Sequence, residues 1–573
     1  MLRRVRTTLL FGLLSILLFA FYFLHLCRNA ISDNELRYST SILTPRSKNS
    51  SLQYAVRANH DSQELGPLRT RRVSSIGDSI ATVSVLLPDW QVLVIVSPET
   101  ELSPGFGKEY ACLFQNNATS PARFSGILAF SNQTTFKCVM PNSARRLRQF
   151  LQPILSTQSE KESPVAKAMP KLIRWTFLAY ESYSTEDDVV LFVKGLNHRQ
   201  RFNRTPGNFR CVFGDGTKAA AKTAVTSSIQ EVFRCDHPNL TAVGSDGYDG
   251  RIKISLEIVA ENLMVPSVAH YKPPRRIGNP GEPRSLLCAC TMVYNVAKFL
   301  KEWVTYHSSI GVQKFILYDN DSDDDLGRVV KELNQEGYNV TTLFWIWPKT
   351  QEAGFSHGAI YAKESCTWMM YLDVDEFVFS PSWHSFVKPT NSMLTSLLPG
   401  APRQFPPSGR WIGQVMIRCN EFGPSNRTSH PVEGVTQGYT CRRKVEQRHK
   451  SIVQLDAIDS SLRNAVHHFQ LNENFRSKTL SIGEAVINHY KYQAWSEFRT
   501  KFRRRVSTYV VDWTKAANPH SKDRTPGLGF EAIEPEGWAE KFCEVRDNRL
   551  ESLTKQWFGS HTSHGYEKLA WQS

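Results

Sequence analysis

Trp368-Met-Met-Tyr-Leu372 is an apolar run that continues directly into Asp373-Val-Asp-Glu-Phe377. The run predicts a buried strand, and the alternation of side chains along a strand places Asp373 and Asp375 on one face. Two carboxylates this close repel each other unless a cation lies beside them. Oxygen ligands suit Mn²⁺, with Mg²⁺ as the second choice, and both ions also coordinate diphosphates. Because Asp-x-Asp alone is usually a surface turn, the strand before it is what favours a metal site.

The sequence before this motif alternates strand and helix patterns, which predicts an α/β domain. Apolar runs predict strands at residues 286–293, 314–318 and 340–347, and helical spacing follows Asn295 and runs from Leu326 to about Gly337. Such units form right-handed crossovers with parallel strands, and ligands gather at the carboxyl ends of those strands. Asp319, Asn320 and Asp321 stand at the end of the second strand and offer polar groups for the ribose or base of a nucleotide, and Asp319 and Asn320 are the candidates for donor binding. A solvated loop that caps the next helix explains the same residues.

The 573 residues are too many for one core, and the composition changes along the chain. The expected segments are a cytosolic tail (1–8), a membrane-spanning helix (9–27), a flexible stem (28–79), a β-rich domain (80–268), a linker (269–284), an α/β domain (285–560) and a C-terminal tail (561–573). Short apolar stretches between turns favour a β-sandwich for the β-rich domain, which is a candidate for carbohydrate binding. Cys112 with Cys138, and Cys211 with Cys235, stand in similar contexts and are expected to form disulfides.

The N-terminal apolar segment predicts a membrane protein of the secretory pathway. Residues 9–27 are long enough to cross a bilayer, and the arginines at positions 3, 4 and 6 predict that everything after the helix is lumenal, which is type II topology. A cleaved signal peptide is the competing interpretation. Eight Asn-x-Ser/Thr sequons, and ten cysteines besides Cys27, suit the lumen. The net charge of +15 favours an acidic partner, and a lumenal address argues against nucleic acid.

Five motifs together resemble glycosyltransferase family 92. They are Glu302-Trp-x-x-Tyr-His307, Gly311-Val312, Tyr318-Asp-Asn320, Asp373-Val-Asp-Glu-Phe377 and Asn488-His-Tyr490. The plant members that this chain resembles are galactan β-1,4-galactosyltransferases with a β-rich domain and a type II anchor. The resemblance implies a GT-A (Rossmann-like) fold, UDP-galactose as donor, Mn²⁺, inversion at the anomeric carbon, and growth of the galactan side chains of pectic rhamnogalacturonan at the Golgi membrane. A homodimer is compatible with this interpretation.

Similarity to GT-A enzymes also implies roles for the residues of the motif. Asp373 would hold the donor ribose and also contribute to the metal site, and Asp375 would coordinate the metal directly. His489 would be the third protein contact, because a neutral imidazole suits Mn²⁺. His467 and His468 compete with it for that role.

Inversion by a single displacement also needs a base for the proton of the acceptor hydroxyl, and a carboxylate is the usual choice. Glu421 is the first candidate, and the alternatives are Glu376, Asp456 and Asp459. Lys491 is expected to neutralise the diphosphate of the donor, and the run Arg503–Arg505 could do the same or meet an acidic acceptor.

Two other functions fit parts of the sequence. The first is an inactive transferase domain in a carbohydrate-binding or scaffolding protein, against which the intact Asp373, Asp375 and His489 argue. The second is a metal-dependent phosphate-ester hydrolase, which would need a second cluster of metal ligands that the sequence does not contain.

Overall fold

The computed structural model describes residues 80–97, 109–157, 169–198, 202–214, 221–239, 251–274, 283–400, 409–446, 448–500, 534–561 and 567–572. All of them belong to one compact unit, Gly77–Ser573. The expected cytosolic tail, spanning helix and stem lie outside these residues. In the described ranges no helix is long and apolar enough to cross a membrane.

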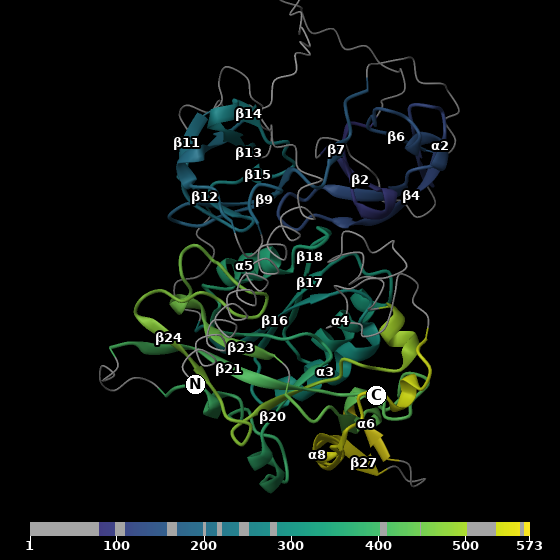
Figure 1. The fold of residues 1–573 in the computed structure, drawn as a ribbon, viewed down its shortest axis with the longest axis vertical. Coiled ribbons are helices and arrows are strands. Elements are labelled where there is room, and N and C mark those ends of the chain that lie inside the picture. The colour runs from purple at the N-terminus through teal and green to yellow at the C-terminus, as the bar shows by residue number, and fades with distance from the viewer. Residues whose placement is uncertain are drawn as a thin grey trace, which may run out of the picture. The chain divides into compact units, whose positions relative to one another are not determined.

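The N-terminal region is β-rich, as predicted, and forms two sheets that follow each other in sequence (Figure 1). The first has the order β6-β3-β4-β5-β2-β1-β7, with β1 (Thr82–Leu86), β2 (Gln91–Val96), β3 (Tyr110–Leu113), β4 (Thr119–Ile127), β5 (Thr134–Val139), β6 (Ile154–Thr157) and β7 (Ile173–Arg174). The second has the order β14-β13-β10-β11-β12-β9-β8, with β8 (Leu178–Ser184), β9 (Val189–Lys194), β10 (Phe209–Phe213), β11 (Ala221–Ile229), β12 (Val232–Cys235), β13 (Ile252–Ile258) and β14 (Leu263–Met264). Each sheet encloses a hydrophobic core of its own, the first around Val94 and Phe136 and the second around Leu191 and Phe213. In the single β-sandwich that the sequence predicts, the two sheets would instead share one core.

The two predicted disulfides, Cys112–Cys138 and Cys211–Cys235, are confirmed. Each joins strands that are second neighbours in their sheet, β3 with β5 and β10 with β12. In a flat sheet second neighbours would be roughly 9.6 Å apart, twice the strand spacing of about 4.8 Å. The bridged Cα atoms are 6.3 Å and 6.0 Å apart, so both sheets curl sharply where they are bridged.

The C-terminal region is an α/β domain built on one mixed sheet, as predicted, with the order β18-β17-β16-β19-β23-β21-β25-β20. Its strands are β16 (Ser285–Val293), β17 (Lys314–Asp319), β18 (Val340–Phe344), β19 (Cys366–Tyr371), β20 (Glu376–Phe379), β21 (Trp411–Glu421), β23 (His449–Gln454) and β25 (Val486–His489), and β24 (Phe475–Thr479) adds to β21. The first four strands pair in parallel, and β23 joins β19 antiparallel. A disulfide, Cys288–Cys366, ties β16 to β19.

Three helices pack on this sheet, α3 (Ala297–Ser309), α4 (Leu326–Gln335) and α5 (Gln351–Tyr361). The first two match the predicted helices, and their apolar faces are buried. Gly337, at φ +95°, follows α4 in the left-handed region that glycine tolerates best. No helix was predicted where α5 lies. It is buried on nearly all sides, so its sequence lacks an apolar stripe.

Besides the short helix α2 (Asn142–Arg145) in the first β-rich part, further elements lie toward the C-terminus. They are α6 (Val435–Gly438), α8 (Arg549–Phe558), the pair β22 (Cys441–Arg442) with β26 (Val545–Arg546), and the pair β27 (Gly559–His561) with β28 (Glu567–Leu569). The disulfide Cys441–Cys543 closes this part of the chain. Regular structure also extends into the expected linker, where β15 (His270–Tyr271) pairs with β13.

Candidate active site

The Asp-Val-Asp motif lies in a turn between β19 and β20, not in a strand as the period-two pattern predicted. The strand β19 ends at Tyr371, and the backbone N–H of Glu376 donates to the carbonyl of Asp373 at 3.1 Å. The turn brings distant segments together, because Glu376 on β20 lies opposite His489 on β25, and His489 lies opposite Glu421 on β21. A cluster of acidic, basic and imidazole side chains forms at this corner of the sheet.

Asp373 is held by a lysine that the sequence analysis did not identify. Its Oδ2 lies 3.0 Å from Nζ of Lys450 and 3.6 Å from Nε2 of His467, and Gln351 donates to Oδ1 at 3.4 Å. Burial alone would raise the pKa of Asp373, but the Lys450 ammonium outweighs it and holds that pKa well below its usual range. Asp373 is therefore an ionised carboxylate that already has a cation beside it.

Lys450 connects Asp373 to a second carboxylate, Glu376. Its Nζ lies 2.7 Å from Oε1 of Glu376, whose Oε2 accepts the backbone N–H of Asp373 at 2.9 Å. Glu376 is fully buried, and burial raises its pKa to about 8 in spite of the nearby ammonium. Burial would lower the pKa of Lys450, but the carboxylates of Asp373 and Glu376 raise it. The lysine therefore stays charged and compensates the buried acid pair.

Asp375 faces a different partner, the imidazole of His489. The Oδ2 of Asp375 lies 3.7 Å from Nε2 of His489, while Nδ1 of the same ring lies 3.4 Å from Glu376. Burial lowers the pKa of His489 well below its usual value, so the ring is neutral. Its buried Nε2 has no hydrogen-bond partner among the described residues. An imidazole nitrogen without a hydrogen-bond partner among the described residues and a carboxylate oxygen thus lie side by side.

The Asp375 and His489 pair fits a divalent cation. Ligand atoms about 2.1 Å from an octahedral ion are roughly 3 Å apart at right angles and roughly 4.2 Å apart across the ion. The separation of 3.7 Å lies between these two spacings, so the two atoms would share one ion after a shift of roughly half an ångström. Asp373 does not join this pair as a ligand in the structure, since its Oδ2 faces Lys450. His467 is also occupied, because its Nε2 lies 2.6 Å from the same ammonium. No group of three or more candidate ligand side chains is assembled within the described ranges.

Glu421 and Lys491, proposed from the sequence as base and diphosphate ligand, form an ion pair with each other. Nζ of Lys491 lies 2.5 Å from Oε1 of Glu421, and Arg443 and Tyr492 each approach Oε2 to 3.4 Å. Glu421 and Lys491 are buried, while a third of the Arg443 side chain is exposed. This carboxylate is one strand pairing away from His489.

Sequence comparison places this cluster in a known family. The family model described as Glycosyltransferase family 92 matches residues 284–525. A family 92 protein of Ricinus communis is 38% identical over 503 residues, which cover 85% of this chain and 84% of the relative. The chain belongs to glycosyltransferase family 92. Relatives from Arabidopsis thaliana and Oryza sativa subsp. japonica are each 40% identical, over 71% and 67% of both chains respectively.

Solved structures add little to this assignment. S. aureus TarS aligns with 39% of this chain and 64% of its own at 11% identity, and the TM-score of 0.22 is too low to support an argument. The family assignment therefore rests on sequence, and it identifies the chain as a glycosyltransferase without naming its donor or acceptor.

In this family 92 glycosyltransferase the loop after β17 holds the other predicted donor residues. Asp319 accepts the backbone N–H of Ser322 at 2.9 Å, and burial raises its pKa. Asn320 donates its amide to the carbonyls of Trp345, at 2.6 Å, and Trp347, at 3.3 Å. Asn320 thus ties its own loop to the one that follows β18.

The other candidates lie outside the acidic cluster. Asp456 forms an ion pair with Arg284 and is 44% exposed, and Asp459 accepts hydrogen bonds within its own turn from Ser461. His468 bonds to His449 instead of a carboxylate. The structure thus brings Asp373, Asp375, His489, Glu421 and Lys491 into one corner of the sheet and leaves these three aside.

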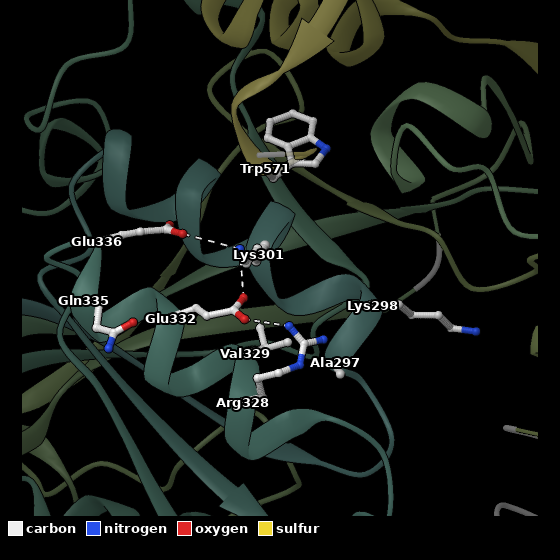
Figure 2. Close-up of a pocket in the computed structure, with 9 residues that line it drawn as sticks. All are labelled: Ala297, Lys298, Lys301, Arg328, Val329, Glu332, Gln335, Glu336 and Trp571. Carbon is white, nitrogen blue, oxygen red and sulfur yellow. Dashed lines mark hydrogen bonds and ion pairs between the residues drawn. The ribbon is translucent and has the colours of Figure 1, made fainter.

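A cavity of about 580 Å³ between α3 and α4, next to Trp571, is not the reaction site (Figure 2). Its charged side chains are already paired, Lys301 with Glu332 and Glu336, and Arg328 with Glu332. None of its lining residues belongs to the acidic cluster.

Proposed function

We propose that this family 92 glycosyltransferase is a GT-A enzyme that transfers galactose from UDP-galactose onto the β-1,4-galactan side chains of pectic rhamnogalacturonan, with inversion and with Mn²⁺, or Mg²⁺ in its place. The observation that carries the proposal is the pairing of Asp375 with the unpartnered nitrogen of His489, 3.7 Å away. The sugar and the linkage come from the resemblance of the sequence motifs. The predicted anchor at residues 9–27 supports a type II location in the Golgi membrane.

Asp375 and His489 would hold the cation, and Asp373 would bind the donor ribose. A bound divalent cation would stabilise the negative charge of the departing UDP. Asp373 suits a hydroxyl donor better than a second metal bond, because Lys450 already neutralises it while 29% of its side chain is exposed. Asp319 and Asn320 would shape the nucleotide end of the site, and Lys491 would turn from Glu421 toward the diphosphate.

The acceptor hydroxyl must lose its proton as its oxygen attacks the anomeric carbon and the bond to UDP breaks. Glu421 is our candidate for the base. Glu376 is held by Lys450 and by the backbone N–H of Asp373, and Asp456 and Asp459 lie outside the cluster. To accept a proton, Glu421 has to loosen its contacts with Lys491 and Arg443, and substrate phosphate competing for those cations would permit it.

The function can be tested on a fragment that begins at Gly77, the start of the compact unit. It would be offered a panel of nucleotide sugars with galactan oligomers, with Mn²⁺ and with a chelator. We expect transfer from UDP-galactose alone, and loss of that transfer with chelator. Transfer from another donor would refute the galactose assignment, and absence of any transfer or UDP release would favour the carbohydrate-binding alternative.

In the same assay Asp375→Ala should abolish transfer, because it removes a metal ligand and not a core side chain. Its thermal unfolding midpoint should stay close to that of the wild type. Asp187→Ala, which removes an exposed carboxylate in the turn between β8 and β9, is the matched control and should remain active. Activity of Asp375→Ala in excess Mn²⁺ would count against the metal-ligand role.

A further inference from the structure

The β-rich region and the α/β domain share a hydrophobic core. One continuous cluster contains Ile95 of β2, Phe192 of β9 and Tyr318 of β17. The indole rings of Trp175 and Trp347 stack with centroids 5.7 Å apart, and both side chains are buried. A module that is only tethered would present a wetter, more polar contact. The two regions are therefore packed as one body.

The first sheet holds the loop after β17 through ion pairs of the buried Asp321 with Lys137, which is largely buried, and with Arg123, which is half exposed. Oδ2 of Asp321 lies 2.7 Å from Arg123 on β4 and 2.6 Å from Lys137 on β5. Only 6% of the Asp321 side chain is exposed, and its backbone lies at φ +66°, which costs energy in a residue other than glycine. The two cations compensate a charge that would otherwise be buried alone. Nearby, β4 passes so close to Phe344 that a Cβ on Gly126 would lie 2.8 Å from its ring.

This loop connects to the acidic cluster through hydrogen bonds. Asn320 holds the carbonyls of Trp345 and Trp347, and the hydroxyl of Thr350 bonds to both of those tryptophans. The next residue, Gln351, donates to Asp373. Displacement of Asp321 would therefore shift the side chains at the ribose end of the proposed donor site.

The second sheet grips another loop of the site in a similar way. The side-chain amide of Gln230 exchanges two hydrogen bonds with the backbone of Asn464, at 2.7 Å and 3.1 Å. Arg234 donates to the carbonyl of Ser460 at 2.6 Å. The same loop continues to His467, which contacts Lys450. Each sheet thus holds one loop that is connected to Asp373, the first through Gln351 and the second through His467.

We propose that the β-rich region is a structural part of the donor site, in which Arg123 and Lys137 act as positioning residues for the loop that binds the nucleotide. The proposal rests on the proposed function for the nature of the donor. In this proposal Arg123 and Lys137 do not contact the donor. They raise its affinity by holding Asp321 and the loop around it in place. It also separates this role from any carbohydrate binding by the β-rich region.

The test is the double variant Arg123→Ala, Lys137→Met in the full chain, with two measurements. Hydrogen exchange of the backbone at residues 319–323 should become faster, because the loop loses its anchor. The KM for the donor and the dissociation constant of UDP should rise about 5- to 30-fold with kcat nearly unchanged, since the loop contributes binding that is equal in ground and transition states.

Two further variants separate positioning from general damage. Arg123→Lys with Lys137→Arg keeps both charges and should restore most of the donor affinity. Lys222→Met removes a comparable pair, with Glu257, inside the second sheet and should change neither the loop nor UDP binding. Asp321→Asn is the substitute if the double variant folds poorly. It removes the charge of Asp321 but keeps the shape of the side chain, so it should raise hydrogen exchange and the donor KM in the same way.

The outcomes are distinguishable. Unchanged exchange at residues 319–323 would overturn the anchoring, and faster exchange with unchanged UDP affinity would overturn its role in the donor site. A fall in kcat alone, with KM unchanged, would also refute the positioning role. Faster exchange in a protein whose wild type binds no UDP would refute the proposed donor and leave the anchoring standing.

Discussion

The two aspartates of the Asp-Val-Asp turn are two residues apart, yet their surroundings are opposite. Asp373 has an ammonium 3.0 Å away and 29% of its side chain exposed, whereas Asp375 is 7% exposed and faces a neutral imidazole. Asp373 thus lies against a cation, whereas Asp375 lies against a second potential metal ligand. A turn can therefore place two neighbouring carboxylates in different surroundings. We infer that Asp373 binds a hydroxyl group of the donor and that Asp375 binds a metal ion.

Among the substitutions that test this contrast between Asp373 and Asp375, the one at Lys450 should have the largest effect on stability and activity. Lys450→Met leaves the partly exposed Asp373 and the fully buried Glu376 without their shared cation, which should cost about 3 kcal/mol of stability and abolish transfer. Thermal and denaturant unfolding of the fragment from Gly77 would measure the loss.

Lys478→Met provides the matched control for that variant. Lys478 pairs with Glu484, but both side chains are nearly half exposed, so its loss should cost less than about 1 kcal/mol. If both variants unfolded at the wild-type midpoint, Lys450 would not be compensating the acid pair, and the contrast between the two aspartates would disappear.

The residues that contact Asp373 explain what sequence could and could not predict. The motif itself and His489 were identifiable because a carboxylate pair after an apolar strand and a histidine within a family motif are local signals. Lys450 gave no local signal. It lies 77 positions from Asp373 and enters the cluster only because β23 pairs with β19. Its place two residues before the apolar pair Ile452-Val453 was the one available hint, since a buried lysine needs an acid.

The fold shows the same limit. Strands β16 and β17 were predicted because each is a continuous apolar run that is buried on both faces, and helices α3 and α4 because each buries one face. Helix α5 was missed because Gly354 and Gly358 pack directly on Met292 and Cys290, so that almost no polar face remains. The curl of the two β-rich sheets was hidden for another reason, because cysteine spacing predicts a bridge but not how many strands it crosses.

A substitution at His489, the residue that faces Asp375, should have a smaller effect on activity. His489→Ala removes one of two protein ligands, so the Mn²⁺ concentration for half-maximal transfer should rise at least tenfold, because even loss of an outer partner typically costs about 10- to 100-fold. Calorimetric titration of Mn²⁺ in the presence of UDP would give the same shift without turnover. His468→Ala is the control, since His468 bonds to His449. An equal shift in both variants would remove His489 from the metal site.

The smallest predicted effect comes from a substitution at His357. It tests whether a buried imidazole nitrogen without a hydrogen-bond partner is enough to identify a metal ligand. His357 is also buried, and its Nε2 also has no hydrogen-bond partner among the described residues, but it lies in an aromatic cage with Phe130 and Trp345. Burial lowers its pKa to about 3, below the value of 6.5 in the unfolded chain. The unfolded state therefore takes up the proton first as the pH falls through 6.5, and the fold loses stability between pH 6.5 and pH 3.

His357→Phe should remove that part of the acid dependence. Relative to the wild type, the variant should gain about 1 kcal/mol between pH 7.5 and pH 5.5, measured by unfolding at each pH, with an unchanged requirement for Mn²⁺. His198→Gln, at an exposed position, should leave the pH dependence as it is. A changed Mn²⁺ requirement in His357→Phe would mean that a lone imidazole nitrogen is enough to influence the metal. The neighbouring carboxylate of Asp375 would then no longer distinguish His489 from the other buried histidines, and the assignment of the two aspartates to separate tasks would lose its physical basis.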